Sequence, residues 1–224
     1  MFEFNDVTTP RRGFLGTLAA TAAAGLASLT PLRLEAQPRR GSTSGVDAAF
    51  ETWLNRITGK HKMVFDAPEV NSGMPVIWPR VWLNGNNENY GTKDADNSGV
   101  VIMRHAAIPM AMRDEVWAKY KLGEAFNVKD GEAPATKNIF AKVLPLPLPG
   151  TGTEALLASG VMIGVCNVAL TVYSAMVAQK MSMDAAAVKA DWVAALMPGV
   201  QVVPSGVLAV ARTQEKGCAY CFAG

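Results

Sequence analysis

The chain has 224 residues, half of them apolar, with 21 basic and 19 acidic side chains and a net charge of +2. That length and apolar content suffice for one ordinary domain with a sizeable core. A charge this close to neutral gives no basis for binding nucleic acid or an acidic membrane surface. Three cysteines are an odd number, so at least one thiol is unpaired within the chain and no disulfide framework is expected.

The N-terminus carries the features of an export signal. Residues 11–15 read Arg-Arg-Gly-Phe-Leu and precede an uncharged stretch from 16 to 31. Paired arginines before a mildly apolar segment resemble a twin-arginine signal. We therefore predict a signal segment over residues 1–36 and a periplasmic protein, with a membrane tether only if the signal stays uncleaved.

Residues 37–60 are predicted to hold a linker and an N-terminal helix. The linker, 38–45, is basic and rich in Ser and Gly, which is typical of disorder. Apolar residues then recur at helical spacing until Gly59. The main domain is expected to span residues 61–224.

The first half of this domain alternates strands with helices. Strands are predicted at 61–66 and 99–104, the second closed by His105. Helices are predicted at 78–90 and 109–122, each opened by a proline. Trp117 and Tyr120 are expected in the core.

Residues 124–152 form a long excursion where a third strand would be expected. They contain Pro134 and the run Leu-Pro-Leu-Pro-Leu-Pro, which cannot lie inside a sheet because proline lacks the N–H donor. Such loops often act as lids or interfaces. Thr153 is expected to cap a short helix that follows.

Residues 160–180 are uncharged before Lys180, so two interpretations arise. About 20 apolar residues can span a bilayer as a helix. Alternatively, residues 161–165 form a strand buried on both faces and a helix begins near Asn167, a good N-cap residue. The high content of Ala, Gly, Ser and Asn favours the strand-turn-helix interpretation.

In that interpretation, Cys166 lies where a strand ends and a helix begins. Helix N–H groups and the positive end of the helix dipole would face its sulfur, which favours thiolate over thiol. A nucleophilic or sulfur-carrying cysteine needs such a setting. The alternative is a small buried hydrophobe, a common role for cysteine.

The chain ends with further helices and strands. A helix is predicted at 184–196, a strand at 201–204, a helix from Ser205-Gly206 to Lys216, and a last strand at 217–222. This alternation predicts an α/β fold with a parallel sheet and helices on both faces. Sites in such sheets lie at the carboxyl ends of the strands, which is where His105, Cys166 and Ser205 fall.

Two segments resemble a known family. GVMIGVCNVAL (160–170) and VQVVPSGVLAVARTQEKGCAY (200–220) are similar to the DsrE/DsrF-like sulfur-relay proteins, whose relatives include the YchN-like proteins. There a strand ends in Cys, and Val-Pro-Ser-Gly-Val and Gln-x-x-Gly precede the final strand. The resemblance covers about residues 61 to 222 and looks like an exported branch of that family. It implies a three-layer α/β/α sandwich with strand order 4-3-2-1-5, and trimers or hexamers.

The resemblance also implies roles for the residues at the strand ends. The family's cysteine that matches Cys166 accepts sulfur as a persulfide and passes it on. With strands about 4.8 Å apart, His105, Cys166 and Ser205 would share one edge of the sheet. His105 would stabilise a thiolate or shuttle a proton, or else be satisfied by backbone or solvent. Asn167, Ser205 and Gly206 are the expected substrate-binding residues.

Cys218 and Cys221 depart from the family pattern and invite a redox or metal interpretation. On an extended strand they would lie about 10 Å apart on opposite faces, which is beyond disulfide reach. Only His61 and His105 are available as further zinc ligands, and Phe222 stands where haem attachment needs His. We therefore interpret them as a structural pair.

These patterns predict an exported sulfur carrier or thiol-dependent sulfur-handling protein that uses Cys166. Its partners would be sulfur donor or acceptor proteins and further copies of the chain, with no nucleic acid, metal or cofactor. The alternative hypothesis is a non-catalytic oligomeric module that binds a small ligand or a partner protein.

Overall fold

The computed structural model describes residues 47–142, 144 and 148–224. The expected export signal and the linker at 38–45 lie outside these residues. The described part falls within one compact unit, Val46–Gly224.

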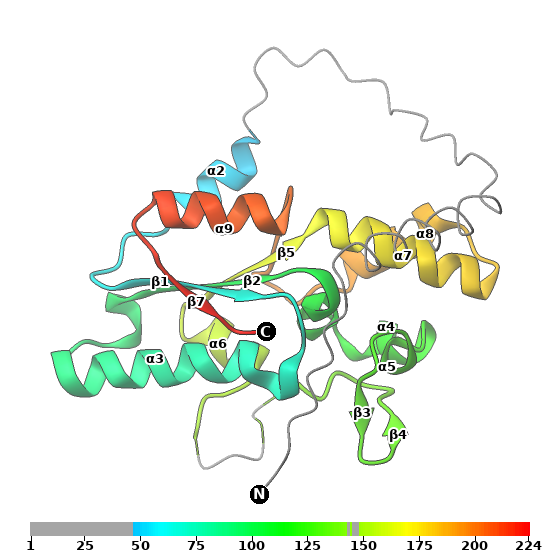
Figure 1. Cartoon of the computed structure of the whole chain (residues 1–224), viewed down its shortest axis with the longest axis horizontal. Coiled ribbons are helices and arrows are strands. Elements are labelled where there is room, and N and C mark those ends of the chain that lie inside the picture. Colours follow the sequence, from blue (N-terminus) through cyan, green and yellow to red (C-terminus); the bar gives the residue numbers. More distant parts are fainter. Residues whose placement is uncertain (1–46, 143, 145–147) are drawn as a thin grey trace, which may run out of the picture. The chain divides into compact units, whose positions relative to one another are not determined.

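Five parallel strands form the central sheet (Figure 1). They are β1 (Lys62–Ala67), β2 (Ser98–Met103), β5 (Met162–Cys166), β6 (Gln201–Val203) and β7 (Ala219–Phe222). The order across the sheet is β6-β5-β2-β1-β7, and every neighbouring pair is parallel. Numbered along the chain, this is the expected order 4-3-2-1-5.

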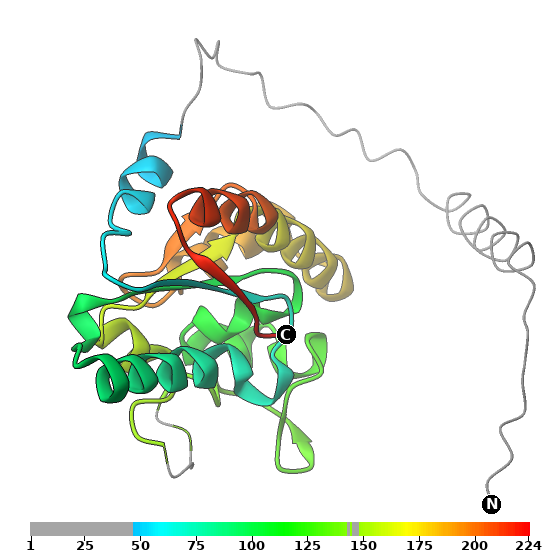
Figure 2. The ribbon, with the colours of Figure 1, turned by 60° about the vertical axis from the view of Figure 1, so that its left-hand side comes forward.

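Helices cover both faces of the sheet, which makes the fold a three-layer α/β/α sandwich as predicted. One face carries α2 (Ala48–Leu54) and α9 (Gly206–Glu215), and the opposite face carries α3 (Met74–Tyr90) and α6 (Thr153–Ala158) (Figures 1 and 2). Each face has its own cluster of buried apolar side chains. Every residue of the central strands β2 and β5 is buried, as expected for strands covered on both sides.

The uncharged stretch at 160–180 is a strand followed by a helix. β5 passes directly into α7 (Asn167–Met181), which lies against α8 (Ala185–Ala194). Among the described residues, no helix is both long and apolar enough to cross a bilayer. The strand-turn-helix interpretation is therefore confirmed.

The N-terminal helix α2 is part of the α/β unit rather than a preceding segment. Phe50, Trp53 and Leu54 are buried in the cluster that also holds Val64 and Val203 from the sheet. The domain boundary expected at residue 61 therefore lies further towards the N-terminus. Side chains at helical spacing need a partner surface, and the sheet supplies it.

Two helices begin at residues other than the predicted prolines. α3 begins at Met74, with Pro75 in its first turn, and Pro79 lies inside the helix. Pro79 removes only one backbone hydrogen bond and is buried, so packing outweighs that loss.

Pro109 does not open a helix either. It lies in the 3-10 segment η3 (His105–Ala111), and the helical residues follow as α4 (Asp114–Lys119) and α5 (Leu122–Ala125). Its carbonyl oxygen accepts a hydrogen bond from Trp117 Nε1, which is buried as expected, and so is Tyr120.

The excursion at 124–152 is largely tied to the rest of the unit. It contains a short antiparallel pair, β3 (Lys129–Asp130) and β4 (Ala133–Pro134). The buried Asn138 amide donates to the carbonyls of Met110 and Met112. Thr153 is the first residue of α6 rather than its cap, and its hydroxyl also donates to Met110. The two other short helical segments are η1 (Asn71–Gly73) and η2 (Asp94–Asp96).

Candidate functional site

Reactive and charged side chains gather towards the carboxyl ends of the parallel strands. Cys166 is the last residue of β5 and also the N-cap of α7. Its Sγ accepts a hydrogen bond from the backbone N–H of Ala169 at 3.3 Å. The thiol is buried, with the residue 6% exposed. The sulfur thus lies in the first turn of a 15-residue helix, where the unpaired N–H groups point outwards.

Asn167 is not the helix cap that the sequence predicted, and its contact with substrate stays a prediction. It is the first helical residue of α7, and Cys166 takes the cap position with φ −66° and ψ 115°. The backbone carbonyl of Asn167 accepts from the Thr171 hydroxyl. The cap position moved by one residue because β5 continues through Cys166 in register with Val203 of β6.

Arg104 is the cation next to Cys166. The β2–β5 register pairs Met103 with Val165, so the following residues, Arg104 and Cys166, are neighbours at the end of the sheet. Arg104 donates from Nε and Nη2 to the two carboxylate oxygens of Asp66, at 2.7 and 3.0 Å. Asp66 is 5% exposed, so a buried carboxylate fixes the orientation of this guanidinium.

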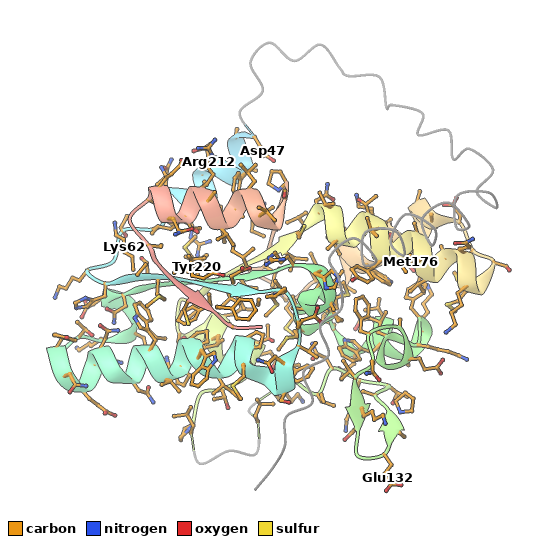
Figure 3. All side chains as sticks on the ribbon, in the orientation of Figure 1. Asp47, Lys62, Glu132, Met176, Arg212 and Tyr220 are labelled. Carbon is orange, nitrogen blue, oxygen red and sulfur yellow. The ribbon has the colours of Figure 1, made fainter. Side chains whose placement is uncertain are left out.

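Tyr220 completes this arrangement from strand β7 (labelled in Figure 3). Its hydroxyl donates to Asp66 Oδ2 at 2.9 Å. Burial is the main cause that raises the pKa of Tyr220, followed by the hydrogen bond to Asp66. The hydroxyl therefore stays protonated and remains a donor at neutral pH.

Arg104 likewise stays protonated and positively charged. Its pKa is raised, first by the hydrogen bond to Asp66 and less by the negative charges available on Asp66, Tyr220 and Cys166. A permanent cation thus lies within electrostatic reach of the cysteine sulfur.

His105 follows Arg104 but contacts other partners than Cys166. Its Nδ1 lies 2.8 Å from Glu69 Oε1, and its ring meets Tyr173 of α7 edge-on, with centroids 5.5 Å apart. The backbone at His105 has φ 48°, the left-handed region. In the described part of the chain no hydrogen bond joins its ring to Cys166. The imidazole is 56% exposed and lies at the outer margin of the site.

Ser205 and Gly206 lie beside Arg104 at the start of α9. Ser205 is the N-cap, but its hydroxyl makes no capping hydrogen bond. A Cβ at Gly206 would lie 2.6 Å from the Cβ of Arg104. Gly206 therefore lets the helix pack against the arginine side chain. The contact of Ser205 and Gly206 with substrate stays a prediction.

Cys218 and Cys221 lie apart from this edge. Cys218 is buried on the α2 and α9 side of the sheet, whereas Cys221 packs against the other core cluster, as the strand alternation predicts. All three cysteines are free thiols. Burial raises the pKa of Cys218 to about 11 and also raises the pKa of Cys221. Neither is a group that ionises readily near neutral pH.

A large cavity lies elsewhere in the molecule. It measures about 1110 Å³ and is lined by the excursion and the start of α3. Its wall combines apolar side chains such as Val70, Ile77 and Phe140 with charged ones such as Lys129 and Asp130. None of the predicted site residues lines it. No group of three or more potential metal ligands occurs among the residues described.

Asp66, Arg104 and Tyr220 are not among the residues that the sequence pattern predicted for the site. A usable signal was present, because Asp66 and Arg104 each follow a run of apolar strand residues. Polar residues at the carboxyl ends of parallel strands meet at one edge of the sheet. Tyr220 gave no comparable signal, since only the position of β7 beside β1 brings its hydroxyl to Asp66.

No family model matches the sequence, and no curated protein matches it either. Among solved structures, the chain is similar to MTH1491 of Methanobacterium thermoautotrophicum, described as a protein of unknown function. The identity is 17%, the TM-score is 0.39, and the alignment covers 73% of this chain and 99% of that one. A similarity at this level carries no functional argument.

Proposed function

We propose that this protein is an exported sulfur carrier in which Cys166 accepts a sulfane sulfur and holds it as a persulfide. The observation that carries the proposal is the position of Cys166 Sγ in the first turn of α7, where it accepts the Ala169 N–H. A sulfur atom that must be both nucleophile and carrier requires stabilisation of its anionic form.

Two features of the site suit a sulfur anion. The N–H groups and dipole of the helix favour negative charge at the cap position. Arg104 follows the neighbouring strand, and its positive charge interacts with Cys166. The terminal sulfur of a persulfide would occupy the same positive environment.

His105 is assigned the proton transfer at the margin of this site. Glu69 contacts its Nδ1, which leaves Nε2 to exchange a proton with an arriving or departing sulfur group. Because His105 makes no direct hydrogen bond to Cys166 in the described residues, its contribution is expected to be smaller than that of Arg104.

The resemblance to the DsrE/DsrF-like sulfur-relay family supports the same function. The strand order expected from the resemblance agrees with β6-β5-β2-β1-β7. The paired arginines at positions 11 and 12 support export to the periplasm. We propose that the exported protein receives sulfur from a donor there and passes it to an acceptor.

Intact-mass spectrometry tests the proposal. After incubation with a sulfane-sulfur donor, the protein should gain one sulfur atom, and peptide mapping should place it on Cys166. Cys166→Ser should abolish the gain. The matched control, a Cys218→Ser and Cys221→Ser double variant, should retain it. Absence of added sulfur at Cys166 in the native protein would refute the function.

The cavity of about 1110 Å³ supports a second candidate, a non-catalytic module that binds a small ligand or a partner protein. Its mixed apolar and charged wall suits an amphiphilic ligand. If Cys166→Ser retains every measurable function and an Ile77→Trp change in the cavity wall abolishes it, this candidate replaces the first.

A further inference from the structure

We propose that Arg104 recognises the sulfur donor, and that the donor is a small sulfane-sulfur anion with an oxidised sulfur head: thiosulfate or an organic thiosulfonate. This inference rests on the proposed function and specifies its substrate class. It makes Arg104 a binding residue for the oxygen atoms of the donor.

Part of the Arg104 guanidinium is free to bind a ligand. Asp66 occupies Nε and one hydrogen of Nη2. Nη1 has no hydrogen-bond partner among residues 47–142, 144 and 148–224, and the Arg104 side chain is 27% exposed. A planar guanidinium held on one edge by a carboxylate presents its other N–H groups in a fixed direction. Those groups suit an oxyanion with several acceptor oxygens.

The supporting residues make this orientation rigid. Asp66 is buried and accepts from both Arg104 and Tyr220. Gly206 lies against the arginine stem, with space for no larger side chain. Asp66, Tyr220 and Gly206 thus fix the guanidinium at the end of β2, the strand next to the one that ends in Cys166.

The burial of Cys166 limits the size of the donor. With 6% of the residue exposed, the thiol is poorly accessible to a persulfide on the surface of another protein. A donor of a few heavy atoms can enter, and an anionic one gains the helix N-terminus and Arg104 together. Size and charge therefore favour a small anion as the donor.

The transfer step balances without any other reactant. The Cys166 thiolate attacks the sulfane sulfur of thiosulfate, a new S–S bond forms, and the bond between the two donor sulfurs breaks. The electron pair leaves with sulfite, and the product is the Cys166 persulfide anion. A thiosulfonate reacts in the same way and releases a sulfinate. Arg104 binds the oxygens of the leaving group throughout.

Local hydrogen bonds rather than long-range attraction supply the binding. Asp66 and Arg104 together carry no net charge, so the attraction to a distant anion is small. The rate of sulfur transfer should therefore depend only weakly on ionic strength.

The experiment uses two pairs of reagents on the full mature protein. Iodoacetate and iodoacetamide differ in charge but little in size, and their alkylation rates at Cys166 report the preference for an anion. Thiosulfate and benzenethiosulfonate report sulfur loading by mass spectrometry from an inorganic and an organic source. Cysteine hydropersulfide, which is similar in size to benzenethiosulfonate, serves as a donor without an oxidised sulfur head.

Two variants displace or remove the guanidinium. The Asp66→Asn and Arg104→Gln double variant removes both charges and leaves no unpaired buried carboxylate. Gly206→Ala keeps all charges but forces the arginine to move. Arg212→Gln is the matched control, because Arg212 is exposed and lies on the side of α9 away from the sheet (Figure 3).

We expect each test variant to lower the iodoacetate-to-iodoacetamide rate ratio and the second-order loading rate with both oxyanion donors. The loss should be roughly tenfold to a hundredfold, as for a lost hydrogen bond to a charged group. Loading from cysteine hydropersulfide should change less than threefold. Arg212→Gln should match the native protein throughout.

The outcomes separate this inference from the proposed function. If the hydropersulfide loads Cys166 but neither oxyanion donor does, the function stands and the inference is wrong. It is equally wrong if the oxyanion donors load Cys166 at unchanged rates in both variants. If no donor loads Cys166 while iodoacetamide still alkylates it, the proposed function itself fails.

Discussion

The contacts of single side chains distinguish the three cysteines. Cys166 receives a backbone N–H and lies near a guanidinium, whereas Cys218 is surrounded by apolar side chains. The same residue type therefore has different surroundings at two places in one molecule. At Cys218, burial raises the pKa of the thiol.

Cys218 leads to a pH-dependent prediction. Its pKa of about 11 in the folded protein lies above the ordinary value of 9.0, so the folded state retains a proton that the unfolded state releases. Its contribution to stability is complete below pH 9 and is lost as pH rises towards 11. The urea midpoint should fall between pH 8 and pH 11, and less steeply in Cys218→Ala.

The raised pKa values of Tyr120, Tyr173 and Tyr220 act in the same direction. Cys218→Ala should therefore still lose part of its stability as the pH rises. An equal slope in the native protein and in Cys218→Ala would contradict the assignment to this thiol.

Among the secondary-structure elements, α2 shows how packing sets the limits of a domain. Its seven residues are too few for a stable isolated helix. It persists because Phe50, Trp53 and Leu54 are buried with strand residues, and because Asp47 caps the N–H of Phe50. The helix is thus a component of the core.

Leu54→Ala tests that conclusion. Leu54 is 1% exposed, so the change should leave a cavity and lower the free energy of unfolding by about 2 to 5 kcal/mol. Chemical denaturation followed by tryptophan fluorescence gives the value. Val207→Ala, at a residue 69% exposed on α9, is the control and should change stability by less than about 0.5 kcal/mol. Equal small losses in both variants would mean that α2 is not integrated into the fold.

At the scale of the whole molecule, parallel pairing brings distant parts of the chain to one edge. Asp66, Arg104, Cys166 and Tyr220 lie in or directly after four different strands, and the hydrogen bond between Tyr220 and Asp66 joins residues 154 positions apart. The site exists only when the sheet is complete. Destabilising any strand should therefore reduce sulfur loading together with stability.

The association state is also a property at this scale. Val168, Val172 and Met176 follow one another at intervals of four along α7 and are 49% to 58% exposed (Met176 is labelled in Figure 3). An apolar stripe of this kind is typical of an interface. In agreement with the family resemblance, we predict trimers or hexamers by light scattering coupled to size exclusion.

The double variant Val172→Glu and Met176→Glu should dissociate the oligomer, because it places charges on that stripe. Gln179→Glu, at an exposed position near the end of α7, is the matched control and should keep the native mass. A native protein that elutes with the mass of one chain would refute the prediction.

The sequence by itself determined the layout of the fold. Buried apolar runs, glycine stops and helical spacing identified five strands and the α/β class, because local propensity and the hydrophobic pattern agree in those segments. The same reasoning placed Cys166 at a strand-to-helix junction and the pair Cys218 and Cys221 on opposite faces.

Only the tertiary structure decided which side chains meet. Local rules favoured Asn167 as the cap and prolines 79 and 109 as helix starts, but packing and strand register overrode them. The pattern suggested His105 as the partner of Cys166, whereas the register gives that position to Arg104 and directs His105 to Glu69. Contacts across the sheet depend on strand order and on the direction of each side chain, and neither is encoded in the spacing along one segment.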